Sequence, residues 1–237
     1  MNILVFQHIA CEHPGIFRQF FSEAGIDWQA VELDAGDSIP DLQGFDALWV
    51  MGGPMDVWDT DTCPWLVAEK EAICHWVREL NRPYLGLCLG HQLLADALGG
   101  TCEVQRNPEI GIMDVSLTDA AREDLLLQGV APRIKCLQWH SVAVTTPPDD
   151  AVLLASSPEC TWQAMRVGSN AWGIQFHVEL QDTTISEWNA VPAYAQALDK
   201  VKGPGALKEM KDQAAQHMTQ FKSNARILFD NFCRSIS

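Results

Sequence analysis

The first hundred residues alternate short apolar runs with longer amphipathic segments. Short runs of this kind are typical of buried strands, whereas apolar residues spaced three to four positions apart are typical of helices. Parallel strands need a crossover between them, usually a helix, so the alternation predicts an α/β fold with a mostly parallel central sheet flanked by helices. The expected strands are residues 3–6, 28–33, 45–51 and 84–87, and the expected helices are residues 14–24, 64–80 and 90–98.

From residue 101 the pattern changes to shorter runs rich in β-forming residues, separated by Pro, Asp, Gly and Ser. We expect these runs to form a small antiparallel addition and the returning strands of the main sheet. The last expected helix spans residues 205–233, where apolar side chains recur at helical spacing. The β-rich runs are residues 102–105, 110–117, 142–145, 152–155, 162–166 and 171–176.

Length, charge and cysteine usage limit the class of protein. A chain of 237 residues with 47% hydrophobic content and no evident linker predicts a single domain over residues 1–237, with a core of about 1–180 and a C-terminal helical segment of about 181–237. The net charge of −15 and the lack of a basic run argue against nucleic-acid binding. No leader or membrane-length apolar segment is evident. Eight cysteines without a CxxC pair indicate reduced thiols and a cytoplasmic location.

One segment combines a strand, a cysteine and a helix start. Gly86-Leu87-Cys88-Leu89-Gly90 has the shape of a nucleophile elbow, where flanking glycines allow close strand–helix approach and the central side chain stands at a strained turn. The helix N-terminus stabilises a thiolate, and the next backbone N–H is free to bind an oxyanion. The pattern favours acyl transfer at Cys88. A buried core cysteine beside glycines that only permit tight packing is the alternative.

A candidate base lies at the end of a later apolar strand. His177 and Glu179 are two positions apart in Trp172-Gly-Ile-Gln-Phe-His-Val-Glu179, and alternate residues of a strand share one face. If that face meets the elbow, His177 can accept the thiol proton and Glu179 can hold the other ring nitrogen. A solvated strand end would carry the same pattern.

Together these motifs resemble the class I (triad) glutamine amidotransferases. Gly-Leu-Cys-Leu-Gly-His-Gln and the later Gln-Phe-His-x-Glu are joined by a Gly-Gly-Pro loop at residues 52–54 and by Gln138-Trp-His-Ser141, in the family order. The resemblance is closest to the stand-alone members that are similar to the glutaminase part of GMP synthetase. It implies a flavodoxin-like version of the α/β fold.

The resemblance also implies a role for each matching residue. Cys88 is expected to form a γ-glutamyl thioester and release ammonia, with His177 as acid and base and Glu179 as its orienting partner. The backbone N–H groups of Gly53 and Leu89 are expected to form the oxyanion hole. The ends of the substrate are expected to be bound by the side chain of Gln92 and by the main chain around Trp139, His140 and Ser141.

Two features depart from the family pattern. Val178 stands where proline is usual between the histidine and the glutamate, which we expect to alter stiffness but not chemistry. Residues 180–204 match no family motif and are interpreted as a lid or a partner surface. The sequence has neither a phosphate loop nor a recognised zinc spacing, so we expect no cofactor and no metal.

Three functions remain open at this point. The first is a glutaminase that passes ammonia to a separate synthetase subunit. The second is a γ-glutamyl peptidase or hydrolase, in which water or another amine accepts the same acyl group. The third is a non-catalytic binding or regulatory module, which the presence of Cys88, His177 and Glu179 together disfavours.

Overall fold

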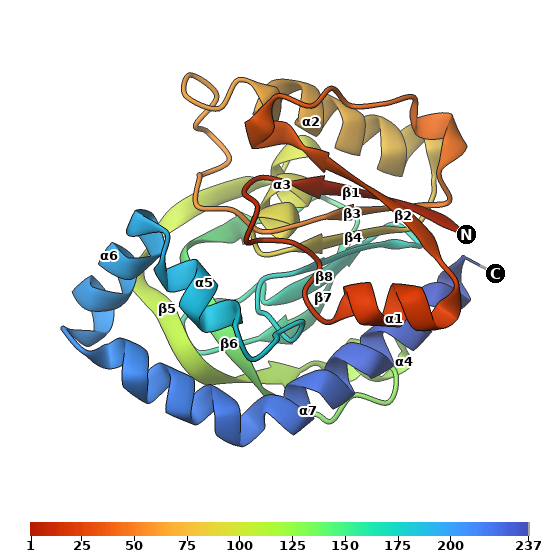
Figure 1. Cartoon of the computed structure of the whole chain (residues 1–237). Coiled ribbons are helices and arrows are strands. Elements are labelled where there is room, and N and C mark those ends of the chain that lie inside the picture. Colours follow the sequence, from red (N-terminus) through yellow and green to blue (C-terminus); the bar gives the residue numbers. More distant parts are fainter. Residues whose placement is uncertain (237) are drawn as a thin grey trace.

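The computed structural model describes residues 1–236, and within them the strands form one nine-stranded sheet (Figure 1). The strand order is β2-β1-β3-β4-β9-β8-β7-β5-β6. The first five strands in this order run parallel to one another, as the sequence predicts. They are β1 (Asn2–Gln7), β2 (Asp27–Glu32), β3 (Ala47–Val50), β4 (Tyr84–Leu87) and β9 (Ala171–Ile174).

The other strands are antiparallel and continue the same sheet, because β8 pairs directly with β9. This part is larger than the small addition expected. Residues 102–105 and 110–117 were predicted as separate strands, but they belong to one strand, β5, which pairs along its length with β6. A register shift between Val104 and Glu109 absorbs the intervening Pro108, as bulges do. The bounds are β5 (Thr101–Leu117), β6 (Arg133–Thr146), β7 (Ala151–Ser156) and β8 (Ala164–Val167).

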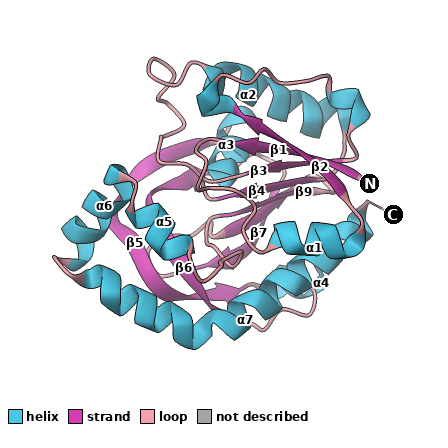
Figure 2. Cartoon of the chain, in the orientation of Figure 1, coloured by secondary structure: helices cyan, strands magenta, loops and turns pink. Residues whose placement is uncertain are grey.

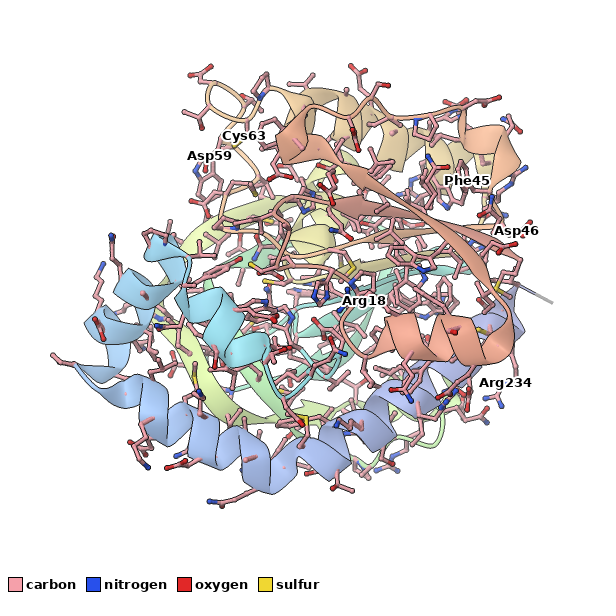
Figure 3. All side chains as sticks on the ribbon, in the orientation of Figure 1. Arg18, Phe45, Asp46, Asp59, Cys63 and Arg234 are labelled. Carbon is pink, nitrogen blue, oxygen red and sulfur yellow. The ribbon has the colours of Figure 1, made fainter. Side chains whose placement is uncertain are left out.

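Helices cover both faces of the parallel half (Figure 2). Side chains alternate between the two layers, since Ile3 and Val5 pack with α1 and α7 whereas Leu4 and Phe6 pack with α2 and α3. Side chains fill the space between the sheet and each layer (Figure 3). The helices are α1 (Phe17–Ala24), α2 (Trp65–His75) with the π-helical turn Trp76–Leu80, α3 (Leu89–Ala97), α4 (Asp119–Glu123) and α7 (Ala206–Ser235), and 3₁₀ turns occur at Leu33–Ala35 and Leu42–Gly44.

A third cluster covers the long antiparallel strands. Helices α5 (Thr184–Asn189) and α6 (Pro192–Lys202) pack with part of α7 against Ile110, Leu137 and Trp139 of β5 and β6. This arrangement places the segment that matched no motif beside the carboxyl end of β4, where ligands commonly bind in α/β sheets. In residues 1–236 no helix is both long and apolar enough to cross a membrane. All eight cysteines, which lie in this range, are free thiols.

Candidate active site

Cys88 occupies the sharp turn between β4 and α3. Its backbone lies at φ 53° and ψ −104°, a conformation that residues with a side chain rarely adopt. The turn is fixed by a 2.8 Å hydrogen bond from the Cys88 N–H to the carbonyl of Ile174 on β9. Gly90 allows the close approach of helix and sheet, since a Cβ there would lie 2.0 Å from the carbonyl oxygen of Val50. The structure therefore has the strained geometry expected of an elbow.

His177 and Glu179 meet as expected, but they do not lie on a regular strand. Strand β9 ends at Ile174, and His177 instead forms an isolated antiparallel bridge with Leu137 of β6. The His177 Nδ1 lies 2.6 Å from Oε1 of Glu179, and the other carboxylate oxygen accepts a hydrogen bond from the N–H of Val178. The expectation of one regular strand was wrong because β9 ends at Ile174 and the backbone then pairs with β6 at His177. The side chains meet across this irregular segment.

The electrostatics of His177 favour its protonated form. Burial lowers the pKa of His177, but Coulombic attraction from Glu179 and hydrogen bonding to Cys88 and Glu179 outweigh it, so the pKa lies well above its usual value. Because the Glu179 carboxylate accepts a hydrogen bond, Nδ1 of His177 carries a hydrogen. Nε2 is then the ring nitrogen that can contact the Cys88 thiol. The Cys88 sulfur also accepts a 3.6 Å contact from the side-chain amide of Gln175. His177 and Gln175 therefore both contact the thiol, and Glu179 contacts it only through His177.

Cys88 opens onto a small cavity of about 100 Å³. Leu89 is the first residue of α3, and its N–H and that of Gly53 donate no hydrogen bond within residues 1–236. His177 and Glu179 are almost fully buried and do not line the cavity. Six of the predicted residues do line it, namely Gly53, Cys88, Gln92, Trp139, His140 and Ser141.

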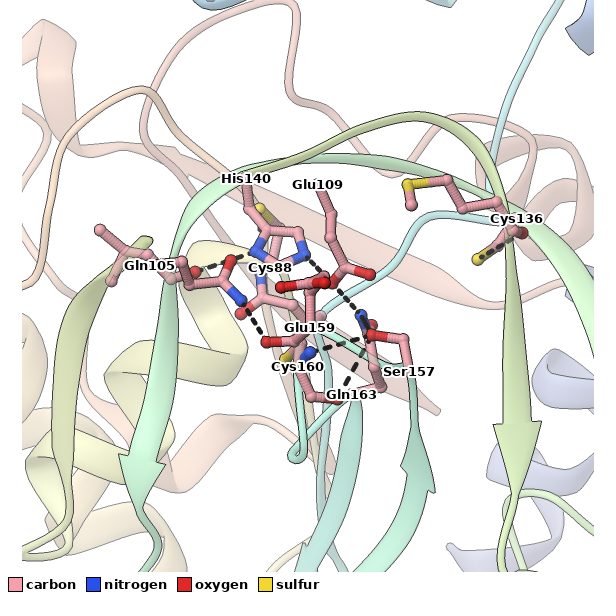
Figure 4. Close-up of polar contacts among 12 residues, drawn as sticks. Cys88, Gln105, Glu109, Cys136, His140, Ser157, Glu159, Cys160 and Gln163 are labelled. Carbon is pink, nitrogen blue, oxygen red and sulfur yellow. Dashed lines mark hydrogen bonds and ion pairs between the residues drawn. The ribbon is translucent and has the colours of Figure 1, made fainter. Parts of the chain in front are cut away.

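Gln92 and His140 shape the wall of this cavity. The Gln92 side-chain nitrogen donates to the carbonyl of Val142 and to the side-chain oxygen of Gln175, so this nitrogen is already engaged by the protein. The Nδ1 of His140 donates to the same Val142 carbonyl, at 3.0 Å. Behind His140, Glu109 accepts from the Gln163 amide and lies 3.3 Å from the His140 Nε2 (Figure 4). The buried network holds residues 140–142 in place.

One wall of the site was not predicted from the sequence. Tyr194 of α6 lines the cavity, and Trp188 of α5 packs edge-on against the His177 ring with centroids 4.6 Å apart. The Trp188 indole N–H donates to the carbonyl of Cys11, which ties α5 to the loop after β1. Trp188 therefore packs over the catalytic histidine candidate and Tyr194 over the cavity, whereas the choice between a lid and a partner surface stays a prediction. Trp188 and Tyr194 lie on two separate short helices and form no motif that sequence reasoning could recognise.

Glu12 is a second carboxyl group beside the histidine that the sequence analysis did not single out. It lies in the loop after β1, is 2% exposed and accepts a hydrogen bond from the Tyr194 phenol. Burial raises the pKa of Glu12, although attraction to His177 and the hydrogen bond from Tyr194 act in the opposite direction. In residues 1–236 no group of three His, Cys, Asp or Glu side chains could hold a metal ion.

Comparison with known families gives a match over most of this architecture. The model of the family described as glutamine amidotransferase class-I matches residues 16–187, a range that contains Cys88, His177 and Glu179. The chain belongs to this family. It is accordingly a glutamine amidotransferase enzyme, and the resemblance stated from the sequence is confirmed.

Two relatives and one solved structure show how far the similarity extends. The glutamine-hydrolyzing subunit of GMP synthase from Sulfolobus acidocaldarius is 36% identical over 157 residues, which cover 65% of this amidotransferase and 78% of the relative. The protein of the same name from Sulfurisphaera tokodaii is 39% identical, with 60% and 71% covered. A glutamine amidotransferase structure from Thermotoga maritima superposes with a TM-score of 0.88 at 23% identity, covering 100% of this chain and 98% of that one.

The structural match and the family model cover different lengths of the amidotransferase. The structural match confirms the predicted fold class over the whole chain, including α6 and α7. The family model ends at residue 187, immediately before Trp188, so the Trp188–Tyr194 wall of the cavity lies outside the shared sequence pattern. The catalytic candidates lie within that pattern.

Proposed function

We propose that this amidotransferase hydrolyses the side-chain amide of glutamine through a γ-glutamyl thioester on Cys88. The observation that carries the proposal is the convergence of a strained cysteine and a buried His177–Glu179 pair at one small cavity. A histidine hydrogen bonded to a thiol and oriented by a carboxylate is the arrangement required for nucleophilic acyl transfer. The family assignment supports the same substrate.

The first half-reaction forms the acyl enzyme. Nε2 of His177 takes the thiol proton, and the Cys88 sulfur attacks the amide carbon, so that the carbonyl oxygen becomes an oxyanion held by the N–H groups of Gly53 and Leu89. When the tetrahedral adduct collapses, the C–N bond breaks and His177 gives its proton to the departing nitrogen, which leaves as ammonia. Glu179 stabilises the imidazolium throughout.

The second half-reaction regenerates the enzyme. His177 removes a proton from water, the resulting hydroxide attacks the thioester, and the C–S bond breaks to give glutamate and the Cys88 thiolate, which recovers its proton from His177. Substrate positioning falls to the main chain around Trp139, His140 and Ser141, whose orientation Gln92 fixes through the Val142 carbonyl.

The destination of the ammonia is inferred from relatives. Two matched relatives are named as the glutamine-hydrolyzing subunit of GMP synthase, a name that denotes one part of a larger enzyme. We infer that this chain likewise supplies ammonia to an acceptor on a separate synthetase subunit.

The proposal is tested with the purified chain. Glutamine and a γ-glutamyl dipeptide are supplied in parallel, and glutamate, ammonia and free amine are measured for the wild type, Cys88→Ala and the control Cys74→Ala, which changes a partly exposed thiol on α2. Ammonia release from glutamine by the wild type and the control, but not by Cys88→Ala, is the expected result. Faster turnover of the dipeptide than of glutamine would identify a γ-glutamyl hydrolase instead.

A further inference from the structure

His8 and Glu69 form a second buried histidine–glutamate pair, separate from His177 and Glu179. His8 follows β1 and Glu69 lies on α2, and both side chains are fully buried. The His8 Nε2 lies 2.8 Å from Oε1 of Glu69, and its Nδ1 lies 2.9 Å from the carbonyl oxygen of Gly52. Burying such a pair carries a large desolvation cost unless both groups are well bonded. The group that His8 holds is part of the Gly-Gly-Pro loop beside Cys88.

The partners of His8 determine where its hydrogens lie. A carbonyl oxygen can only accept, so Nδ1 carries a hydrogen and donates it to Gly52. Nε2 lies 2.8 Å from Oε1 of Glu69, so a second hydrogen lies between these two atoms, and a charged Glu69 favours the imidazolium form of the ring. Burial lowers the pKa of His8, but the attraction and hydrogen bond of Glu69 and the bond to Gly52 outweigh it, and the pKa is raised.

The Gly52 carbonyl and the Gly53 N–H belong to the same peptide unit. The described chain contains no cis peptide bond, so these two groups point in opposite directions. His8 holds the carbonyl, which directs the N–H of Gly53 away from His8, and Gly53 lines the cavity with Cys88. The hydrogen bond from His8 to the Gly52 carbonyl therefore sets the direction of the Gly53 N–H, which is the candidate oxyanion donor.

This peptide needs an anchor because it joins two glycines. Glycine adopts φ angles of either sign at little cost, so a peptide between glycines inverts more readily than one between residues with side chains. Met51 is held on both sides, by the carbonyl of Phe6 and the N–H of Gly90, but those bonds stop one residue earlier. Among residues 1–236, His8 is the hydrogen-bond partner of the Gly52 carbonyl. A Cβ at Gly52 would lie 2.4 Å from a carboxyl oxygen of Glu12, so a stiffer residue there would displace the Glu12 side chain.

We propose that His8 is a positioning residue that locks the Gly52–Gly53 peptide with the Gly53 N–H aimed at the developing oxyanion. This inference rests on the proposed function, since it assigns a support to that oxyanion hole. The His8–Glu69 pair also polarises the peptide through a charge-assisted hydrogen bond, which makes the N–H a stronger donor. Glu69 acts through His8, from a helix that contributes nothing else to the mechanism.

Two nearly isosteric variants separate this role from packing. In His8→Asn the side-chain NH₂ takes the place of Nδ1 and can still donate to Gly52. In His8→Gln the NH₂ reaches toward Glu69 and the bond to Gly52 is lost. Since losing one oxyanion donor commonly lowers kcat about 10²–10³-fold, we expect His8→Gln to lower kcat by at least about tenfold with KM nearly unchanged. His8→Asn should recover most of this loss.

The alkylation rate of Cys88 distinguishes positioning from packing. If His8 only supported the packing around Cys88, its substitution would change this rate as well as kcat. Iodoacetamide reacts with the thiolate by displacement and generates no oxyanion, so its rate should be unchanged in both variants. His75→Gln, which alters a partly exposed histidine at the end of α2 that pairs with Glu79, is the matched control and should leave turnover and alkylation unchanged. Equal losses of kcat in His8→Asn and His8→Gln, or slowed alkylation in step with kcat, would overturn the proposal.

Nuclear magnetic resonance tests the role of His8 independently of whether the enzyme hydrolyses glutamine. Wild-type ammonia release is measured first, and its absence contradicts the proposed function before any variant is compared. The ¹⁵N spectrum of His8 and the amide resonance of Gly53 do not depend on turnover. We expect both ring nitrogens to carry hydrogen, and the Gly53 resonance to shift in His8→Gln but little in His8→Asn. A ring without hydrogen on Nδ1 would overturn the inference whatever the activity.

Discussion

The phenol of Tyr194 donates a hydrogen bond to the buried carboxyl group of Glu12. Tyr194 belongs to α6 and Glu12 to the loop after β1, so this bond joins the two segments that close over the active site. Burial, followed by repulsion from Glu12, raises the pKa of Tyr194 well above its usual value, which keeps the phenol protonated and able to donate. The bond between α6 and the loop after β1 therefore persists across the neutral pH range.

Tyr194→Phe should weaken the contact between α6 and the loop after β1. The change keeps the ring against Trp139 but removes the hydrogen bond to Glu12. A buried acceptor without its partner costs about 1–3 kcal/mol. Because Tyr194 forms part of the cavity wall, we expect a higher KM for glutamine and a smaller change in kcat, measured by steady-state ammonia release.

Glu12→Gln tests whether the bond or the charge matters. The amide oxygen can still accept from Tyr194, so a KM near that of the wild type would assign the effect to the hydrogen bond. An increase in KM as large as that of Tyr194→Phe would show instead that the carboxyl charge beside His177 is required.

Trp188 should determine how firmly His177 is held. Its ring packs edge-on against the imidazole and against Trp139, with centroids 6.0 Å apart in the second contact. Trp188→Ala removes a buried ring, for which a loss of about 3–5 kcal/mol in the free energy of unfolding is typical. We also expect a lower kcat, because the imidazole gains freedom to rotate. Trp188→Phe retains an aromatic contact and should keep most of both quantities, measured by urea unfolding and glutamine turnover.

The catalytic candidates could be predicted from the sequence because their signals are local. The glycines around Cys88 and the spacing of His177 and Glu179 are features of short segments with a direct mechanical meaning. The wall formed by Trp188 and Tyr194 could not be predicted, since it depends on how α5 and α6 return across β6. Glu12 and His8 were also missed as site residues. Their role depends on contacts 40 or more residues away in sequence, which no local pattern contains.

The strand predictions failed where the chain tolerates an irregularity. Pro108 and the polar residues before it look like a break, but the register shift in β5 accommodates them without ending the strand. His177 lies beyond β9, although its apolar neighbours continue the strand pattern. In both cases pairing with β6 decides the backbone path, and the pairing partner is distant in the sequence.

The strain at Cys88 predicts a trade-off between stability and activity. A non-glycine residue at its φ of 53° and ψ of −104° costs on the order of 1–3 kcal/mol, whereas glycine tolerates positive φ. We therefore expect inactive Cys88→Gly to unfold at a higher urea concentration than inactive Cys88→Ala, despite the greater flexibility of glycine in the unfolded chain. The comparison between two inactive variants removes any contribution of the thiol. A lower midpoint for Cys88→Gly than for Cys88→Ala would show that the turn is unstrained, because only the flexibility of glycine in the unfolded chain would then separate the two variants.

The raised pKa of His177 should appear as a pH-dependent stability. A histidine with a folded pKa above its unfolded value, which is about 6.5, stabilises the folded state fully below that unfolded value. This contribution is lost as the pH rises through the raised folded pKa, because the folded state then releases the extra proton. We expect the stability advantage of the wild type over His177→Asn to be largest below about pH 6.5 and to shrink at higher pH. Urea unfolding from about pH 6 to about pH 9 measures this advantage, with His75→Asn as a control at a partly exposed histidine. An advantage that grows with pH would mean that burial, rather than Glu179, dominates the titration of His177.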